Sequence, residues 1–78
     1  MIAEYRYSLL LELDAETGTY TVTCPALPGL VTQGDTAEEA IAMGKDAIRC
    51  HVEGLLKDNE PIPEEVQPPQ VVTVWVAA

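Results

Sequence analysis

A chain of 78 residues has room for one hydrophobic core, so we expect a single domain over residues 1–78. Its formal net charge is −9, from 13 acidic against 4 basic residues. This balance argues against nucleic-acid binding by the chain alone, because phosphate binding depends on lysine and arginine. The hydrophobic fraction of 47% excludes a disordered acidic tail.

Neither a secretory leader nor a membrane span is predicted. The start of the chain lacks a basic region, and the apolar run Leu9–Leu11 is too short for the core of a signal peptide. No stretch approaches the ~20 apolar residues that a membrane helix needs. Cys24 and Cys50 are the only cysteines, and we expect both to be free thiols in a reducing cytoplasm. In so small a chain without a disulfide, self-association is the stabilising device that we expect.

The first part of the chain predicts a short antiparallel meander. Residues 4–13 place tyrosine or leucine at every odd position, and residues 19–24 alternate threonine with Tyr20, Val22 and Cys24. A period of two predicts half-buried strands, and the turn at residues 14–18 joins them into a hairpin. Pro25–Gly29 ends the second strand because its two prolines lack a backbone donor. Leu30–Gln33 is predicted as a short third strand.

The clearest helix begins after Thr36. Thr36 and Glu39 have the spacing of a capping box, and Asp35 and Glu38 add negative charge at the positive end of the helix dipole. Apolar or small residues then recur at steps of three and four, which predicts an amphipathic helix from Ala37 to about Lys57. The expected stripe comprises Ala37, Ala40, Ile41, Gly44, Ala47, Ile48, His51, Val52, Leu55 and Leu56.

The end of the chain predicts a fourth strand. Residues 60–70 hold four prolines and indicate an extended connection. Residues 71–76 are apolar on both faces, as in a strand that is buried on both sides. The fold class is therefore α+β in the order β-β-β-α-β: a three-stranded antiparallel meander, a helix on one face, and a fourth strand parallel to the first. An apolar edge strand invites pairing, and tryptophan is enriched at interfaces. We therefore predict a homo-oligomer interface at Val72, Val74, Trp75 and Val76.

Several residues in these elements match a known family. Residues 20–29 resemble the HicB segment in which a strand ends in a proline and is followed by leucine, proline and glycine. Residues 34–40 resemble a second HicB hallmark, Gly-Asp-Thr followed by Glu-Glu-Ala, and residues 59–63 resemble its Ile-Pro element. The chain is thus similar to HicB-like antitoxins over nearly its whole length. The signature residues are Pro25, Pro28, Gly29, Gly34, Thr36, Glu39 and Ala40.

The resemblance implies a partial ribonuclease H-like fold and a cytoplasmic, non-catalytic protein that neutralises a small basic HicA-like RNA-cleaving toxin by masking it. It also implies a homodimer or a higher homo-oligomer. The chain stops two residues after its last predicted strand, so we expect no C-terminal DNA-binding segment, no direct nucleic-acid binding and no membrane binding. Acidic residues of the hairpin turn and the helix start are the expected toxin contacts: Asp14, Glu16, Asp35 and Glu38.

Two other functions remain open at this stage. One is a solitary homo-oligomeric domain with a regulatory or scaffold role and no toxin. The other is a residual metal-dependent nuclease, which would need several carboxylates converging on Mg²⁺ and is suggested by the fold alone. Glu12 and Asp14 flank the end of the first strand, but no acid lies on a predicted core face. Cys50 and His51 are adjacent, so their side chains diverge by about 100° around the helix. We expect no enzyme activity, metal or cofactor, and a packing role for His51.

Overall fold

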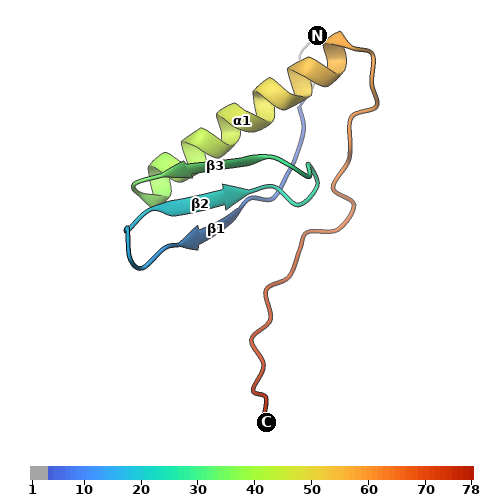
Figure 1. Cartoon of the computed structure of the whole chain (residues 1–78). Helices are drawn as coiled ribbons and strands as arrows, with labels where there is room; N and C mark the ends of the chain where they lie inside the picture. Colours follow the sequence, from blue (N-terminus) through green and yellow to red (C-terminus); the bar gives the residue numbers. More distant parts are fainter. Residues whose placement is uncertain (1–3) are drawn as a thin grey trace.

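The computed structural model describes residues 4–78, which contain three β-strands and one α-helix. The strands are β1 (Leu10–Leu13), β2 (Tyr20–Thr23) and β3 (Val31–Gly34), and the helix is α1 (Ala37–Lys57). The strands pair antiparallel in the order β1-β2-β3. The helix lies across one face of this sheet (Figure 1). The α+β class and the order β-β-β-α are as predicted from the sequence.

The first strand is shorter than residues 4–13, which were predicted to form it. Leu10, the first residue of β1, pairs with Thr23, the last residue of β2. In the same register Ser8 would face Pro25, which has no backbone N–H to donate, so the pairing stops there. The Ser8 amide instead donates to Oε1 of Glu65 at 2.8 Å, and the Ser8 hydroxyl donates to Oε2 at 2.7 Å. A glutamate that follows the helix thus replaces the missing strand partner.

Two consecutive turns connect β2 to β3. The Leu27 amide donates to the Cys24 carbonyl at 3.0 Å, and the Leu30 amide donates to the Leu27 carbonyl at 3.2 Å. Pro28 and Gly29 occupy the two central positions of the second turn, and Gly29 has a φ of +90°. Proline followed by a positive-φ glycine is the signature of a type II turn. The double turn directs Leu27 inward, where it is 1% exposed and packs with Cys24 and Leu30.

Two glycines allow the helix to approach the sheet closely. A Cβ on Gly34, at the end of β3, would lie 2.5 Å from the Ala40 nitrogen and 2.7 Å from its Cα. A Cβ on Gly44 would lie 2.6 Å from Cδ1 of Leu9 and 3.1 Å from Cγ1 of Val22. Ala40 itself is fully buried. The Gly34 and Ala40 signature residues are therefore required by the contact between β3 and the first turns of α1.

Both ends of α1 are capped, and its N-cap is Thr36, as predicted from the sequence. The Thr36 hydroxyl accepts a hydrogen bond from the Glu39 amide at 3.0 Å. Among the described residues, the return bond of a capping box, from the Thr36 amide to the Glu39 carboxylate, is not formed. At the other end Asn59 has a φ of 55°, and the Glu60 amide donates to the Leu55 carbonyl at 2.9 Å. This arrangement is a Schellman motif with asparagine in the left-handed position.

The buried face of α1 is narrower than the stripe predicted from the sequence. Ala40, Gly44 and Val52 are buried, but Ile41 is 41% exposed and Leu56 is 52% exposed. His51 is also exposed, so the prediction that it packs is wrong. For Ile41 and Leu56 the physical reason is the placement of the helix, which packs on β2 and β3 and leaves its side nearest β1 without a covering element.

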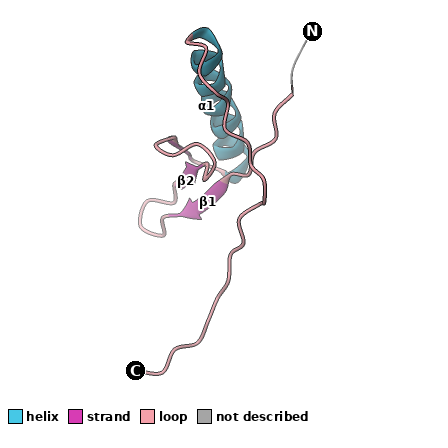
Figure 2. Ribbon diagram, turned by 90° about the vertical axis from the view of Figure 1, so that its right-hand side faces the viewer, coloured by secondary structure: helices cyan, strands magenta, loops and turns pink. Residues whose placement is uncertain are grey.

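The fourth predicted strand requires a correction. Residues 66–78, which we call the C-terminal arm, pair with no strand in the described structure and extend away from the sheet and helix (Figures 1 and 2). The arm gives the molecule its longest dimension, 51 Å against 28 and 19 Å. Every residue of the arm is exposed. No other part of the described chain covers its apolar residues.

Candidate protein-interaction surfaces

The four predicted toxin contacts lie together at one end of the sheet. Leu13, Tyr20 and Gly34 are aligned across the three strands. The β1–β2 turn follows Leu13 and the start of α1 follows Gly34, so these two segments share the left-hand end of Figure 1. We call this region the acidic end. Its four acidic residues are all exposed: Asp14, Glu16, Asp35 and Glu38.

One member of the acidic end also has a structural role. Oδ1 of Asp14 accepts a hydrogen bond from the Glu16 amide at 2.9 Å, and the Asp14 amide donates to the Thr19 carbonyl at 2.9 Å. Asp14 therefore stabilises the hairpin turn through its side chain and its backbone. The carboxylates of Glu16, Asp35 and Glu38 accept no hydrogen bond within residues 4–78, which leaves their charges available to a partner.

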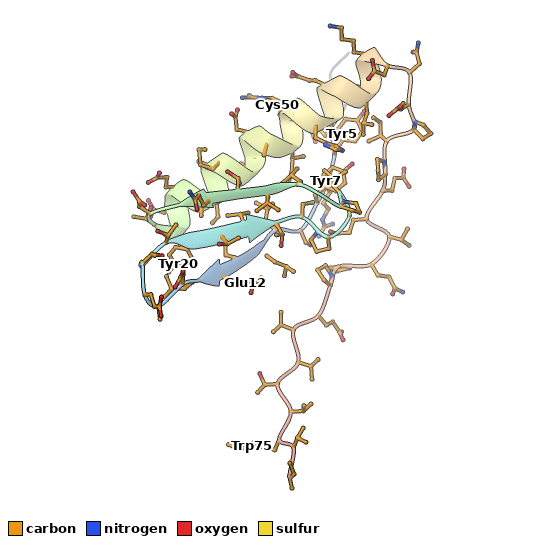
Figure 3. The ribbon with its side chains drawn as sticks, viewed as in Figure 1. Tyr5, Tyr7, Glu12, Tyr20, Cys50 and Trp75 are labelled. Atoms are coloured by element: carbon orange, nitrogen blue, oxygen red, sulfur yellow. The ribbon has the colours of Figure 1, made fainter. Side chains whose placement is uncertain are left out.

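The residues predicted to form an oligomer interface lie on the C-terminal arm. Trp75 is 101% exposed, and Figure 3 shows it near the end of the arm, away from the sheet and the helix. Val72, Val74 and Val76 are each at least 69% exposed. An uncovered run of this hydrophobicity is typical of a surface that a partner covers. The structure brings these four residues together on one segment but does not cover them.

A second uncovered apolar surface lies between the segment leading into β1 and the helix. This β1–α1 groove has a volume of about 890 Å³. One wall consists of Tyr5, Tyr7, Leu9 and Leu11, and the other consists of Ile41, Ile48, Val52 and Leu56. Figure 3 places Tyr5 and Tyr7 beside the second half of α1. The groove exists because α1 packs over β2 and β3 and extends past the β1 edge.

The two surfaces differ in charge, because the groove gathers basic residues together with one acidic residue, Glu53. Three of the four basic residues in the chain line the β1–α1 groove, namely Arg6, Lys45 and Arg49. Arg49 forms an ion pair with Asp46 on the same helix. The acidic end contains none of the basic residues. A basic partner is therefore attracted to the acidic end and is less favoured at the groove.

Tyr7 and Glu65 fix the return of the chain after the helix. The Tyr7 hydroxyl donates to the Pro63 carbonyl at 2.5 Å. Burial raises the pKa of the Tyr7 hydroxyl above its ordinary value. The Ser8–Glu65 bonds lie directly beside this contact. Residues 63–65 are thus held against the segment before β1, and the arm begins immediately afterwards.

The residues considered for chemistry do not gather into a metal site among residues 4–78. Glu12 and Asp14 are exposed at the end of β1. Among residues 4–78 no three histidine, cysteine, aspartate or glutamate side chains are close enough to hold one metal ion. Cys50 and His51 are both exposed, whereas Cys24 is buried and its thiol pKa is raised by that burial. In the described part of the chain, no helix is long and apolar enough to cross a membrane.

Comparison with known proteins identifies the family. Residues 7–74 match the family described as HicB_like antitoxin of bacterial toxin-antitoxin systems. The chain belongs to the HicB-like antitoxin family. It is 47% identical over 60 residues to the UPF0150 protein Ta0767 of Thermoplasma acidophilum, which covers 77% of this chain and 86% of that protein.

Relatives of this HicB-like chain include proteins named as antitoxins. It is 44% identical over 63 residues to Antitoxin HicB 1 of Photorhabdus laumondii, covering 81% of this chain but only 40% of that protein. It is also 43% identical over 61 residues to the UPF0150 protein ssr1765 of Synechocystis, covering 78% of this chain and 76% of that protein. The HicB-like chain therefore corresponds to less than half of the named antitoxin and to most of the two shorter relatives.

Sequence reasoning missed three features of the HicB-like chain. It did not find the contact of Glu65 with Ser8, because a lone glutamate in a proline-rich connection carries no periodic signal. It did not find the β1–α1 groove, since amphipathic periodicity does not show how much of a helix face the sheet covers. The position of Arg6, Lys45 and Arg49 around this groove was missed for the same reason. The sequence nevertheless held one signal for these three residues, because the chain has only 4 basic residues and the position of each one therefore stands out.

Proposed function

We propose that this chain is an antitoxin-type protein-binding domain. It neutralises a small basic HicA-like RNA-cleaving toxin by masking it and has no catalysis of its own. The observation that carries the proposal is the family match over residues 7–74, which spans the sheet, the helix and the returning segment. The similarity to a relative named Antitoxin HicB 1 supports the same function.

The acidic end is the proposed toxin contact. Its carboxylates are exposed and lie at one end of the sheet, where a basic protein can meet them together. Complementary charge of this kind accelerates association and selects the orientation of the partner. In this arrangement the toxin's RNA-binding surface is covered by the bulk of the domain, and no bond in the toxin is made or broken.

The test is co-expression with a candidate toxin, chosen among the short reading frames for basic proteins in the genome that encodes this chain. We expect the two proteins to co-purify, and we expect the complex to leave RNA intact under conditions in which the basic protein alone cleaves it. Separate elution of the two proteins, or unchanged RNA cleavage in their mixture, would contradict the proposal.

A pair of charge-matched variants tests the contact itself. The double variant Glu16→Lys/Glu38→Lys reverses two charges of the acidic end, and Asp58→Lys/Glu60→Lys reverses two charges beyond the end of α1. Both change the net charge equally, so non-specific attraction falls equally in each. We expect the first variant to lose toxin affinity at least tenfold and the second to stay within about threefold of the unmodified protein. Equal losses would show that net charge, and not the acidic end, governs binding.

The second candidate function is that of a solitary homo-oligomeric regulatory or scaffold domain. The exposed arm favours self-association, because Val72, Val74, Trp75 and Val76 have no covering surface in the single chain. Analytical ultracentrifugation at micromolar concentration is expected to give at least a dimer. A stable oligomer without any toxin partner would favour this second function over the first, whereas a monomer would exclude it.

A further inference from the structure

We propose that residues 61–65, which we call the strap, open and close as one unit on a folded core and thereby set how far the C-terminal arm reaches. The strap runs from the end of α1 to the segment before β1, and the arm follows it directly (Figure 1). In the closed state the arm is anchored at Glu65, and in the open state only at the end of α1. The motion takes place within one chain, so this inference depends on neither the toxin nor self-association.

Three hydrogen bonds, which we call the latch, close the strap. The Tyr7 hydroxyl donates to the Pro63 carbonyl, and the Ser8 amide and hydroxyl donate to the two carboxylate oxygens of Glu65. Within the strap only Ile62 and Glu65 are half-buried, and the other residues are exposed. A segment with little apolar burial and a few hydrogen bonds near the surface opens at lower free energy than the core of a domain.

The hydrophobic core does not include the strap. The buried residues Cys24, Leu27 and Leu30 pack with a set of partly buried residues that all precede the end of α1: Tyr7, Leu9, Ala26, Ala47 and Ile48. Tyr7 belongs to both parts, because its side chain packs against this cluster and its hydroxyl bonds to the strap. Opening of the strap therefore breaks the latch and leaves the packing of the core intact.

The chemistry of the strap keeps the open and closed states close in free energy. The Ser8–Glu65 bonds are only part-buried, so water replaces them when the strap opens and no polar group is left buried without a partner. Pro61 and Pro63 restrict the open strap and so lower the entropy that closing removes, which allows a few hydrogen bonds to close it. The bond from the Glu60 amide to the Leu55 carbonyl fixes the end of α1 separately, so the opening begins after Glu60.

The state of the latch determines the reach of the arm. With the strap closed, Trp75 lies at most about 33 Å from Glu65, at ~3.3 Å per residue of extended chain. With the strap open, the free segment begins after Glu60, and the limit becomes about 50 Å from that residue. Because the exposed apolar residues of the arm lie beyond Pro69, the latch limits where a protein that covers them can sit relative to the sheet.

Hydrogen exchange of the full chain in increasing urea tests whether the strap opens on a folded core. The Ser8 amide reports on the latch, and the amide of the buried residue Val52, inside α1, reports on the core. The urea slope of each opening measures the surface that it exposes. We expect Ser8 to be at least about tenfold less protected than Val52 and to have less than about half of its urea slope. Equal protection and equal slopes would show that the strap opens only with the whole domain, which overturns the proposal.

Two variants test whether the strap opens as one unit. Tyr7→Phe removes the bond to Pro63 and leaves both Ser8 bonds in place, whereas Tyr5→Phe removes a hydroxyl from an exposed side chain of the same segment. We expect Tyr7→Phe to lower the protection of the Ser8 amide at least about threefold relative to Val52, because a bond that closes the same unit is lost. Tyr5→Phe is expected to stay within about twofold, below the effect of one bond. An unchanged Ser8 amide in Tyr7→Phe would mean that the two contacts open separately, contrary to the proposal.

The reach of the arm is measured by energy transfer from Trp75, the only tryptophan, to a dye on the exposed thiol of Cys50. Glu65→Ala removes two of the latch bonds, and Glu64→Ala makes the same change of charge at the exposed neighbouring residue. We expect Glu65→Ala to lengthen and broaden the distribution of distances, with the Cys24 thiol still unreactive, and Glu64→Ala to match the unmodified chain. Equal distributions in the two variants would show that the latch does not control the reach of the arm and would overturn the proposal.

Discussion

Replacing Gly34 by alanine tests whether the close contact between β3 and α1 controls the stability of this domain. The new Cβ would lie 2.5 Å from the Ala40 nitrogen, 2.7 Å from the Ala40 Cα and 3.0 Å from the Glu39 carbonyl carbon. All three atoms belong to the backbone of the first helical turns. No rotamer change can relieve the contact, so α1 must move away from the sheet.

The expected cost is a large share of the total stability. Overpacking of a close-packed core costs typically 1–3 kcal/mol, and a contact with backbone belongs at the upper end, at about 2–3 kcal/mol. A domain of this length has a free energy of unfolding of about 4–12 kcal/mol. A loss of about 2 kcal/mol lowers Tm by about 8–16 °C in a domain of this size.

Gly54→Ala is the matched control. Gly54 lies inside α1, and a Cβ at this position would meet nothing within 4 Å. Alanine is better than glycine in a helix by about 0.5–1 kcal/mol, so this variant is expected to be more stable than the unmodified chain. Urea unfolding followed by circular dichroism measures both variants. The protein concentration is kept equal throughout, because self-association adds to apparent stability.

The two variants are therefore expected to change stability in opposite directions. A Gly34→Ala variant within about 0.5 kcal/mol of the unmodified chain, below the usual cost of overpacking, would refute the reasoning. A destabilised Gly54→Ala variant would refute it in a second way, by showing that the helix surface at Gly54 is not open.

Three further predictions concern the cap, the returning segment and the thiols. Thr36→Ala removes the hydroxyl that caps α1 and is expected to lower the free energy of unfolding by about 1 kcal/mol, with Thr36→Ser as the conservative control. Glu65→Ala removes both bonds to Ser8 and is expected to cost about 1–2 kcal/mol and to abolish hydrogen-exchange protection of the Ser8 amide, which Glu65→Gln partly retains. Ellman's reagent at pH 8 is expected to modify Cys50 rapidly and Cys24 only on unfolding, because Cys24 is 2% exposed and its raised pKa lowers the thiolate fraction.

Each of these predictions has an outcome that contradicts it. Equal stability of Thr36→Ala and Thr36→Ser would show that the cap contributes nothing measurable. Persistent protection of the Ser8 amide in Glu65→Ala would mean that another acceptor holds it. Two thiols that react at the same rate in the folded protein would show that the Cys24 core opens readily.

Local sequence determined the parts of this fold whose signals lie within a few neighbouring residues. The range of α1, Ala37–Lys57, followed from the Thr36 cap and from the recurrence of apolar residues. The hairpin followed from alternation, and the end of the second strand at Pro25–Gly29 followed from the missing backbone donors of its prolines. Gly34, Thr36 and Ala40 were named as signature residues from the resemblance, and in the structure they lie at the helix cap and at the contact between β3 and α1.

Only the tertiary structure decided how much of each apolar surface is covered. Periodicity predicted that Ile41, His51 and Leu56 pack on the sheet, but all three are exposed, and Ile41 and Leu56 line the uncovered groove beside β1. The run Val71–Val76 has the composition of a buried strand, yet strand formation needs an edge within reach. In the described structure this run pairs with no strand, and each of its residues is exposed. The sequence thus predicted which apolar residues are suited to burial. The three-dimensional arrangement decided which of them are buried within one chain.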